Sequence, residues 1–161
     1  MGNKSKIALL FLSLMIFAGG CASTSGNQAI TDPEKLHRLV IGQTTENEVK
    51  QMFGEPEQSG MVSGNAMPIS SVTIQKNGVS KVKKFSANEQ FDQWTYMYSK
   101  SSASESPLNF IPYVGLFGHT DTKTDTGTLV LYFDHNGVLT YLNQNKSSSK
   151  CRAGITGSSC S

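Results

Sequence analysis

The sequence predicts an α+β domain in which two short N-terminal helices pack on a small antiparallel β-sheet, with an added β-hairpin. Three observations carry this prediction. Helix-capping residues and apolar residues at helical spacing occupy residues 31–54. Alternating polar and apolar residues, typical of strands, follow at 93–99 and 128–133. Turn sequences, among them Asn77-Gly78, separate the later segments. Helices followed by a run of strands are typical of α+β domains.

The first helix is expected to begin at Thr31 or Asp32 and to end at Gly42. Thr31 can cap the helix with Glu34 reaching back, or Asp32 can cap it with Pro33 in the first turn. Gly42 suits a helix C-terminus because glycine readily adopts a positive φ. Apolar residues stand at helical spacing between these ends: Leu36, Leu39 and Val40.

A second helix is expected after a tight turn. Thr44 or Thr45 can cap it, and Thr45 and Glu48 have the spacing of a capping box. Gly54 stops this helix, and Pro56 prevents its continuation because proline lacks a backbone N–H. Its apolar stripe consists of Val49, Met52 and Phe53.

Two hairpins are expected in the rest of the domain. Residues 69–75 and 79–85 flank Asn77-Gly78, which favours a tight turn because both residues tolerate a positive φ. Residues 128–133 and 138–142 flank a second turn sequence.

Three aromatic residues share one face of the strand expected at 93–99: Trp94, Tyr96 and Tyr98. A ligand-binding stripe is one interpretation of this pattern. Packing of the aromatic rings against the apolar stripe of the second helix is the favoured one, because aromatic residues at strand spacing usually form the packing face of a sheet.

Residues 1–21 resemble a bacterial lipoprotein signal with its lipobox. Lys4 and Lys6 form a positive n-region, and residues 7–17 form an apolar h-region that is too short for a permanent membrane span. Small residues then lead directly into Cys21. The resemblance implies cleavage before Cys21, a diacylglyceryl thioether on its sulfur and an N-acyl chain, with no other cofactor. The alternative is an ordinary signal peptide cleaved at a nearby small residue.

The residues that follow Cys21 bear on location. Neither Ala22 nor Ser23 is an aspartate, and by resemblance to lipoproteins of double-membraned bacteria this implies a lipid anchor on the periplasmic side of the cell outer membrane. Several acyl chains anchor a protein stably, whereas one does so only marginally. We expect residues 21–30 to form the lipidated N-terminus and a flexible tether, because they are small and polar.

The charge of the chain without residues 1–20 is balanced. Lys4 and Lys6 are two of the 14 basic residues, so 12 remain beside 12 acidic ones in a 141-residue chain. That length suits one domain with tails. A neutral domain gives no electrostatic reason to expect a nucleic-acid partner.

The last segment, residues 144–161, is expected to be a low-complexity polar tail. It contains Cys151 and Cys160, an even pair in a compartment that favours oxidation. A disulfide between them is the favoured interpretation. A metal or redox pair is the alternative, although the spacing does not match a CxxC motif.

Taken in order, these motifs resemble those of the SmpA/OmlA (BamE-like) family of outer-membrane lipoproteins. The resemblance rests on Ile41-Gly42, Thr44, Val49, Phe53-Gly54, Pro56, Trp94, Tyr96, Leu129, Leu131, Phe133 and Gly137-Val138-Leu139. It implies that residues 31–143 form a domain with two helices against a three-stranded antiparallel sheet. Two segments depart from the family pattern, namely the hairpin within 58–90 and an apolar insert at 107–126.

The most apolar part of this insert is residues 108–117. Large exposed apolar segments mark contacts with lipid or with protein partners, so this segment is a candidate membrane or partner contact. The alternative is that it completes the core beside the short sheet. The residues proposed for contact are Phe110, Ile111, Tyr113, Leu116 and Phe117.

Two further groups of residues are candidate sites. His119, Asp121 and Asp125 contain only one histidine, and a polar loop is favoured over a metal site. A basic cluster on the expected hairpin, formed by Lys76, Lys81, Lys83 and Lys84, could contact anionic headgroups. Lysines that keep an edge strand soluble are the favoured explanation of that cluster.

The resulting functional hypothesis is a non-enzymatic lipoprotein, because the sequence contains no catalytic constellation or standard motif. It would act as a scaffold or accessory factor in cell-envelope protein assembly. Its partners would be outer-membrane or periplasmic envelope proteins, with the β-barrel assembly machinery implied by the family resemblance. The alternative is a periplasmic inhibitor or ligand-binding module on the same BamE-like fold.

Overall fold

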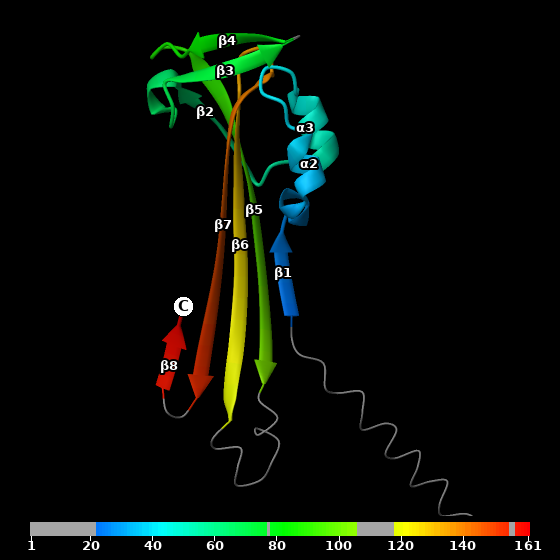
Figure 1. Ribbon diagram of the computed structural model, residues 1–161, viewed down its shortest axis with the longest axis vertical. Helices are drawn as coiled ribbons and strands as arrows, with labels where there is room; N and C mark the ends of the chain where they lie inside the picture. The colour runs from blue at the N-terminus through cyan, green and yellow to red at the C-terminus, as the bar shows by residue number, and fades with distance from the viewer. Residues whose placement is uncertain (1–21, 77, 106–117, 155–156) are drawn as a thin grey trace, which may run out of the picture. The chain divides into compact units, whose positions relative to one another are not determined.

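The computed structural model describes residues 22–76, 78–105, 118–154 and 157–161 (Figure 1). Of these residues, 60% lie in strands and 16% in helices, and only one helix in the described ranges has seven or more residues. The large sheet is antiparallel and has six strands. The protein is therefore mostly β, and the prediction of an α+β, BamE-like fold with two helices on a small sheet is wrong.

The elements follow one another in a simple order. They are β1 (Ala22–Gly26), η2 (Gln28–Thr31), α2 (Pro33–His37), α3 (Glu46–Phe53), β2 (Gln58–Ser63), η3 (Gly64–Ala66), β3 (Ser71–Lys76), β4 (Val79–Lys84), β5 (Gln90–Glu105), β6 (His119–Phe133), β7 (Leu139–Gly154) and β8 (Gly157–Cys160). No helix of the described ranges is both long and apolar enough to cross a membrane.

The large sheet has the strand order β1-β5-β6-β7-β8, and β2 also pairs with β5. In the β2–β5 ladder, Gln58 lies opposite Thr95 and Ser63 opposite Gln90. Strands β3 and β4 form a separate two-stranded sheet, so the hairpin expected on either side of residues 77–78 is confirmed (Figure 1).

The chain divides into two compact units. The described residues of the first unit, here called the strand-end unit, are 22–23, 101–105, 118–124, 149–154 and 157–161. The second, here called the core unit, comprises Thr24–Lys100 and Asp125–Ser148. Strands β5, β6 and β7 each contribute residues to both units.

The core unit buries apolar side chains of α3 against the large sheet. The ring centroids of Phe53 and Tyr96 lie 5.8 Å apart, and those of Trp94 and Phe133 lie 4.7 Å apart. The expected packing role of Trp94 and Tyr96 is confirmed. The buried cluster consists of Ile30, Leu39, Val49, Phe53, Trp94, Tyr96, Leu129, Leu131, Phe133 and Leu139.

A second apolar cluster also lies in the core unit and involves the other side chains of β6. Phe85 and Phe91 pack edge to face with 5.1 Å between ring centroids. Strand residues point alternately to opposite faces, so Tyr132 belongs to this cluster while its neighbours Leu131 and Phe133 belong to the first. The buried members are Met67, Phe91 and Tyr132. The sheet is therefore covered by apolar side chains on both faces here.

Helix α3 begins as its sequence predicts. The hydroxyl of Thr45 accepts a hydrogen bond from the backbone N–H of Glu48, and the Glu48 carboxylate accepts one from the backbone N–H of Thr45, at 3.4 Å and 2.8 Å. This reciprocal pair is a capping box, and it satisfies two N–H groups that a helix start leaves unpaired.

Helix α2 is shorter than the sequence predicts, because it ends at His37 rather than near Gly42. Asp32 caps the helix and Pro33 occupies its first turn, which confirms the second of the two predicted starts. The chain then turns, and the hydroxyl of Thr44 accepts a hydrogen bond from the backbone N–H of Val40 at 2.8 Å. This side chain satisfies a backbone group that a continuing helix would have used itself.

Two segments that were expected to be irregular are ordered elements. Within residues 21–30, strand β1 and the η2 turn replace the expected flexible tether, and Ile30 is 1% exposed in the main core. Within residues 144–161, β7 continues to Gly154 instead of ending as a polar tail. Both segments pair by backbone hydrogen bonds, which do not require the apolar alternation on which sequence analysis relies.

Candidate functional site

The strand-end unit is the candidate functional site. It contains the start of β1 (Ala22–Ser23), the end of β5 from Ser101, the start of β6 up to Thr124 and the end of β7. The described residues on either side of segment 106–117 therefore belong to the same unit as the residue that follows Cys21. Cys21 and the five proposed contact residues, Phe110, Ile111, Tyr113, Leu116 and Phe117, lie outside the described residues.

Cys151 and Cys160 are joined by a disulfide, with 2.08 Å between the sulfur atoms. The two residues also lie opposite each other in the β7–β8 ladder. Next to them, the backbone N–H of Lys150 donates to Ser161 at 2.9 Å, and that of Ser161 donates to Lys150 at 3.0 Å. The cross-link and the ladder together hold β8 against β7.

Arg152 and Asp121 form a two-point ion pair between β7 and β6. The Nε atom of Arg152 lies 2.8 Å from Oδ1 of Asp121, and Nη2 lies 3.3 Å from Oδ2. These hydrogen bonds lower the pKa of Asp121 and raise that of Arg152. The planar guanidinium suits this geometry because it presents parallel N–H donors to a carboxylate.

The same ion pair argues against a metal site formed by His119, Asp121 and Asp125. Nε2 of His119 lies 3.8 Å from Oδ2 of Asp121, but the oxygens of Asp121 already accept from Arg152. Asp125 belongs to the core unit, whereas His119 and Asp121 belong to the strand-end unit. The described residues contain no group of three His, Cys, Asp or Glu side chains placed to hold a metal ion.

The lysines of the basic cluster on the β3–β4 hairpin lie in different environments. The ammonium of Lys83 lies 3.1 Å from Glu89 and 3.5 Å from Asp134, and 5.9 Å from the ring centroid of Phe91. Lys81 and Lys84 are exposed. Lys83 therefore has a structural role, and only part of the cluster is open to solvent.

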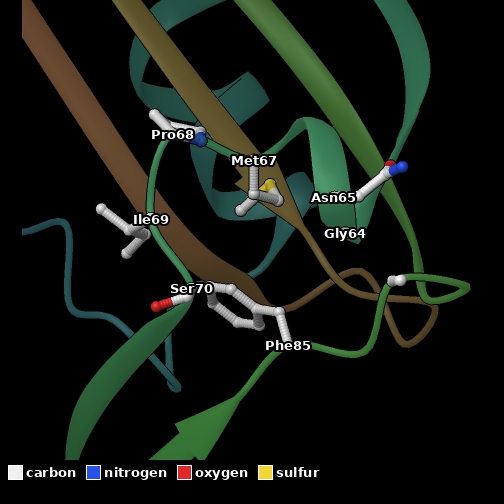
Figure 2. A pocket seen from close by; sticks show the side chains of 8 residues that line it. Gly64, Asn65, Met67, Pro68, Ile69, Ser70 and Phe85 are labelled. Carbon is white, nitrogen blue, oxygen red and sulfur yellow. The ribbon is translucent and has the colours of Figure 1, made fainter.

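A shallow pocket of about 290 Å³ lies at the open end of this hairpin (Figure 2). The backbone N–H of Phe85, directly after β4, donates to the carbonyl of Ser70, directly before β3, at 3.0 Å. Figure 2 shows the side chains of Met67, Ile69 and Phe85 around the pocket. This pocket could not be predicted from the sequence, because its lining comes from segments expected to be loop and strand end.

Comparisons with protein-family models, with curated proteins and with solved structures found no match.

The ion pairs of Arg152 with Asp121 and of Lys83 with Asp134 were also missed by sequence reasoning. Their members are 31 and 51 positions apart in the chain, so no local pattern could reveal them. Oppositely charged residues that are far apart in the sequence can be recognised as cross-strand neighbours only when the strand order is known.

Proposed function

We propose that this protein is a non-enzymatic lipoprotein, anchored by acyl chains on Cys21 to the periplasmic side of the outer membrane. The observation that carries the proposal is the lipobox-like sequence that ends at Cys21. Its role would be that of a scaffold or accessory factor in cell-envelope protein assembly. The basis for this role, and for the β-barrel assembly machinery as a partner, is the order of the sequence motifs, which resembles that of SmpA/OmlA lipoproteins although the fold differs from the one that the resemblance implies.

The composition of the strand-end unit supports a second contact close to the anchor. Residue 22, next to Cys21, belongs to the same unit as the strand ends that border segment 106–117. Acyl chains on Cys21 would therefore bring the described end of β5 and the start of β6 near the lipid surface, and the apolar residues Phe110 and Phe117 stand between these two ends in the sequence. Contact of these side chains with lipid or with a membrane-bound partner would add to the anchor, because affinity at a surface increases when two contacts are linked.

The proposed mechanism is binding without chemistry. A lipid anchor confines a domain to a membrane surface, which raises its effective concentration for partners on that surface. Within the strand-end unit, the Cys151–Cys160 disulfide links β7 to β8 and the Arg152–Asp121 ion pair links β7 to β6.

The anchor is tested with the full chain and its Cys21→Ala variant. Both are expressed in a double-membraned bacterium that is fed a radiolabelled fatty acid. We expect label and outer-membrane fractionation for the unchanged chain, and an unlabelled, periplasmic product for the variant. An unmodified amino terminus on the unchanged chain, measured by mass spectrometry, would overturn the proposal.

The apolar contact is tested by a photocrosslinker placed at Ile111 of the full chain in cells. We expect capture of lipid or of an outer-membrane protein, and loss of that capture in a Phe110→Ser/Phe117→Ser variant. A crosslinker at Met61, which is 69% exposed on β2, serves as the control. Capture of one soluble periplasmic enzyme instead would favour the inhibitor function.

A further inference from the structure

The outer edge of β4 is free within the described part of the chain. Strand β4 pairs with β3, and no other described strand pairs with it. Two of its apolar side chains face solvent, with Val79 67% and Val82 60% exposed. A free strand edge with exposed valines can accept another strand, because its backbone N–H and C=O groups on that side have no strand partner.

The same strand carries positive charge without nearby compensation. Lys81 and Lys84 are both exposed, and no ion pair to either is found in the described ranges, whereas Lys83 is held by Glu89 and Asp134. Side chains alternate along a strand, so Lys81 and Lys84 point to opposite faces of the hairpin. A strand added at this edge would meet one lysine on each of its own faces.

The pocket of Figure 2 begins where β4 ends. Phe85 follows Lys84 directly and lines the pocket with Met67 and Ile69. Its volume of about 290 Å³ is enough for one aliphatic side chain of a peptide. Peptides that add to a sheet edge gain affinity from backbone pairing and specificity from such side-chain pockets.

From these three features we infer that the β4 edge and the adjoining pocket bind an extended acidic segment of a partner protein by β-strand addition. The segment carries two acidic residues three positions apart, which match Lys81 and Lys84, and an aliphatic residue beyond the one that meets Lys84. This inference does not depend on the lipid anchor, so it stands or falls separately from the proposed function.

An acidic strand suits this edge better than a lipid headgroup or a neutral strand. Headgroups would use the charge of the lysines but neither the free backbone edge nor the pocket. Lysines at a sheet edge discourage pairing with neutral or basic strands, and the same charges attract an acidic one. The lysines therefore select the partner as well as protect the edge.

The test uses the detergent-solubilised full chain and a phage-displayed library of random octapeptides. We expect enrichment of peptides with two acidic residues three positions apart and an aliphatic residue near one end. Binding of a synthetic copy of the enriched peptide, followed by fluorescence anisotropy, should weaken roughly tenfold or more in Lys81→Glu/Lys84→Glu, since each lost attraction becomes a repulsion. Ile69→Asp should weaken it through the pocket.

A Lys100→Glu/Lys146→Glu variant is the matched control, because it reverses two exposed lysines on β5 and β7 away from the hairpin. It should bind the peptide as the unchanged chain does. Circular dichroism of all variants checks that each one is folded. The inference is overturned if no acidic pattern is enriched, if both double variants bind equally, or if anionic phospholipid vesicles bind the Lys81 and Lys84 pair and the peptides do not.

Discussion

Lys83 on β4 forms an ion pair with Asp134 in the turn between β6 and β7, with 3.5 Å between Nζ and Oδ2. The other carboxylate oxygen of Asp134 accepts hydrogen bonds from the backbone N–H groups of Asn136 and Val138. Lys83 also contacts Glu89, which follows β4 in the chain. The separate hairpin is thus joined to a turn of the large sheet by a side chain that is 30% exposed.

Replacing Lys83 with alanine should destabilise the protein by about 1 kcal/mol, because two partly buried carboxylates lose their cation. The free energy of unfolding is measured by urea denaturation in low salt. Lys81→Ala is the control, since Lys81 is exposed on the same strand, and it should change stability by less than about 0.5 kcal/mol. Equal effects of the two variants would contradict the assignment of a structural role to Lys83.

The capping box predicts a pH dependence at Glu48. Its pKa lies below the ordinary value of 4.5, because the backbone N–H and then the hydroxyl of Thr45 donate hydrogen bonds to the carboxylate. A carboxyl group with a lowered pKa stabilises the fold above its unfolded pKa, and this contribution is lost as the pH falls through the folded value. Stability should therefore be lower in Glu48→Gln than in the unchanged chain at pH 7, and the difference should shrink below pH 4.5.

The measurement is a series of urea titrations between neutral and acidic pH on both chains. Thr45→Ala should reduce stability at neutral pH by about 1 kcal/mol, and Thr45→Ser should retain most of it, because serine keeps the capping hydroxyl. A difference between Glu48→Gln and the unchanged chain that does not vary with pH would show that the carboxylate charge has no part in the cap.

Local signals in the sequence were sufficient for features that depend on neighbouring residues. The capping box of Thr45 and Glu48, the proline in the first turn of α2 and the β3–β4 hairpin all follow from spacings of a few residues. The fold class was missed because the long strands end in Ser- and Thr-rich stretches with no apolar alternation. Their pairing depends on backbone hydrogen bonds across the sheet, which leave no pattern in a single segment.

Gly42 should not tolerate a side chain. Its φ is +80°, and a Cβ atom there would overlap the Cγ2 atom of Ile74 on β3. Gly42→Ala should cost about 1–2 kcal/mol from the left-handed backbone, with the overlap adding to that. In an Ile74→Ala background the same substitution should cost less, because only the backbone term remains. Identical costs in the two backgrounds, measured as unfolding free energies, would contradict the contact between the two residues.

Reduction of the Cys151–Cys160 disulfide should loosen β8 while leaving the core unit folded. The link closes a loop of nine residue steps at one end of the sheet, so its loss frees a local segment. Hydrogen exchange should become faster at the amides of Lys150 and Ser161, which pair with each other beside the disulfide. The amides of Leu131 and Phe133, in the buried part of β6, should exchange as before. Faster exchange at both sets of amides would show that the disulfide supports the whole fold.

The candidate site could be predicted from sequence only in part. The two cysteines of the tail were identified from their even number, and the structure places them opposite each other in the β7–β8 ladder. The ion pairs of Asp121 with Arg152 and of Lys83 with Asp134 could not be predicted from the sequence, because the members of each pair meet only through the tertiary fold. The pocket beside Phe85 likewise depends on the tertiary packing of residues 64–70 against the segment that follows β4.

The position of β1 limits how far the folded protein could move from a membrane-bound Cys21. Strand β1 begins at Ala22 and pairs with β5, and the backbone N–H of Asn27 then donates to Met97 at 2.7 Å. An extended residue spans only about 3.5 Å, so no slack chain separates residue 21 from the sheet. The start of β1 would therefore stay next to the bilayer, and the strand ends that it joins would be presented at the membrane surface.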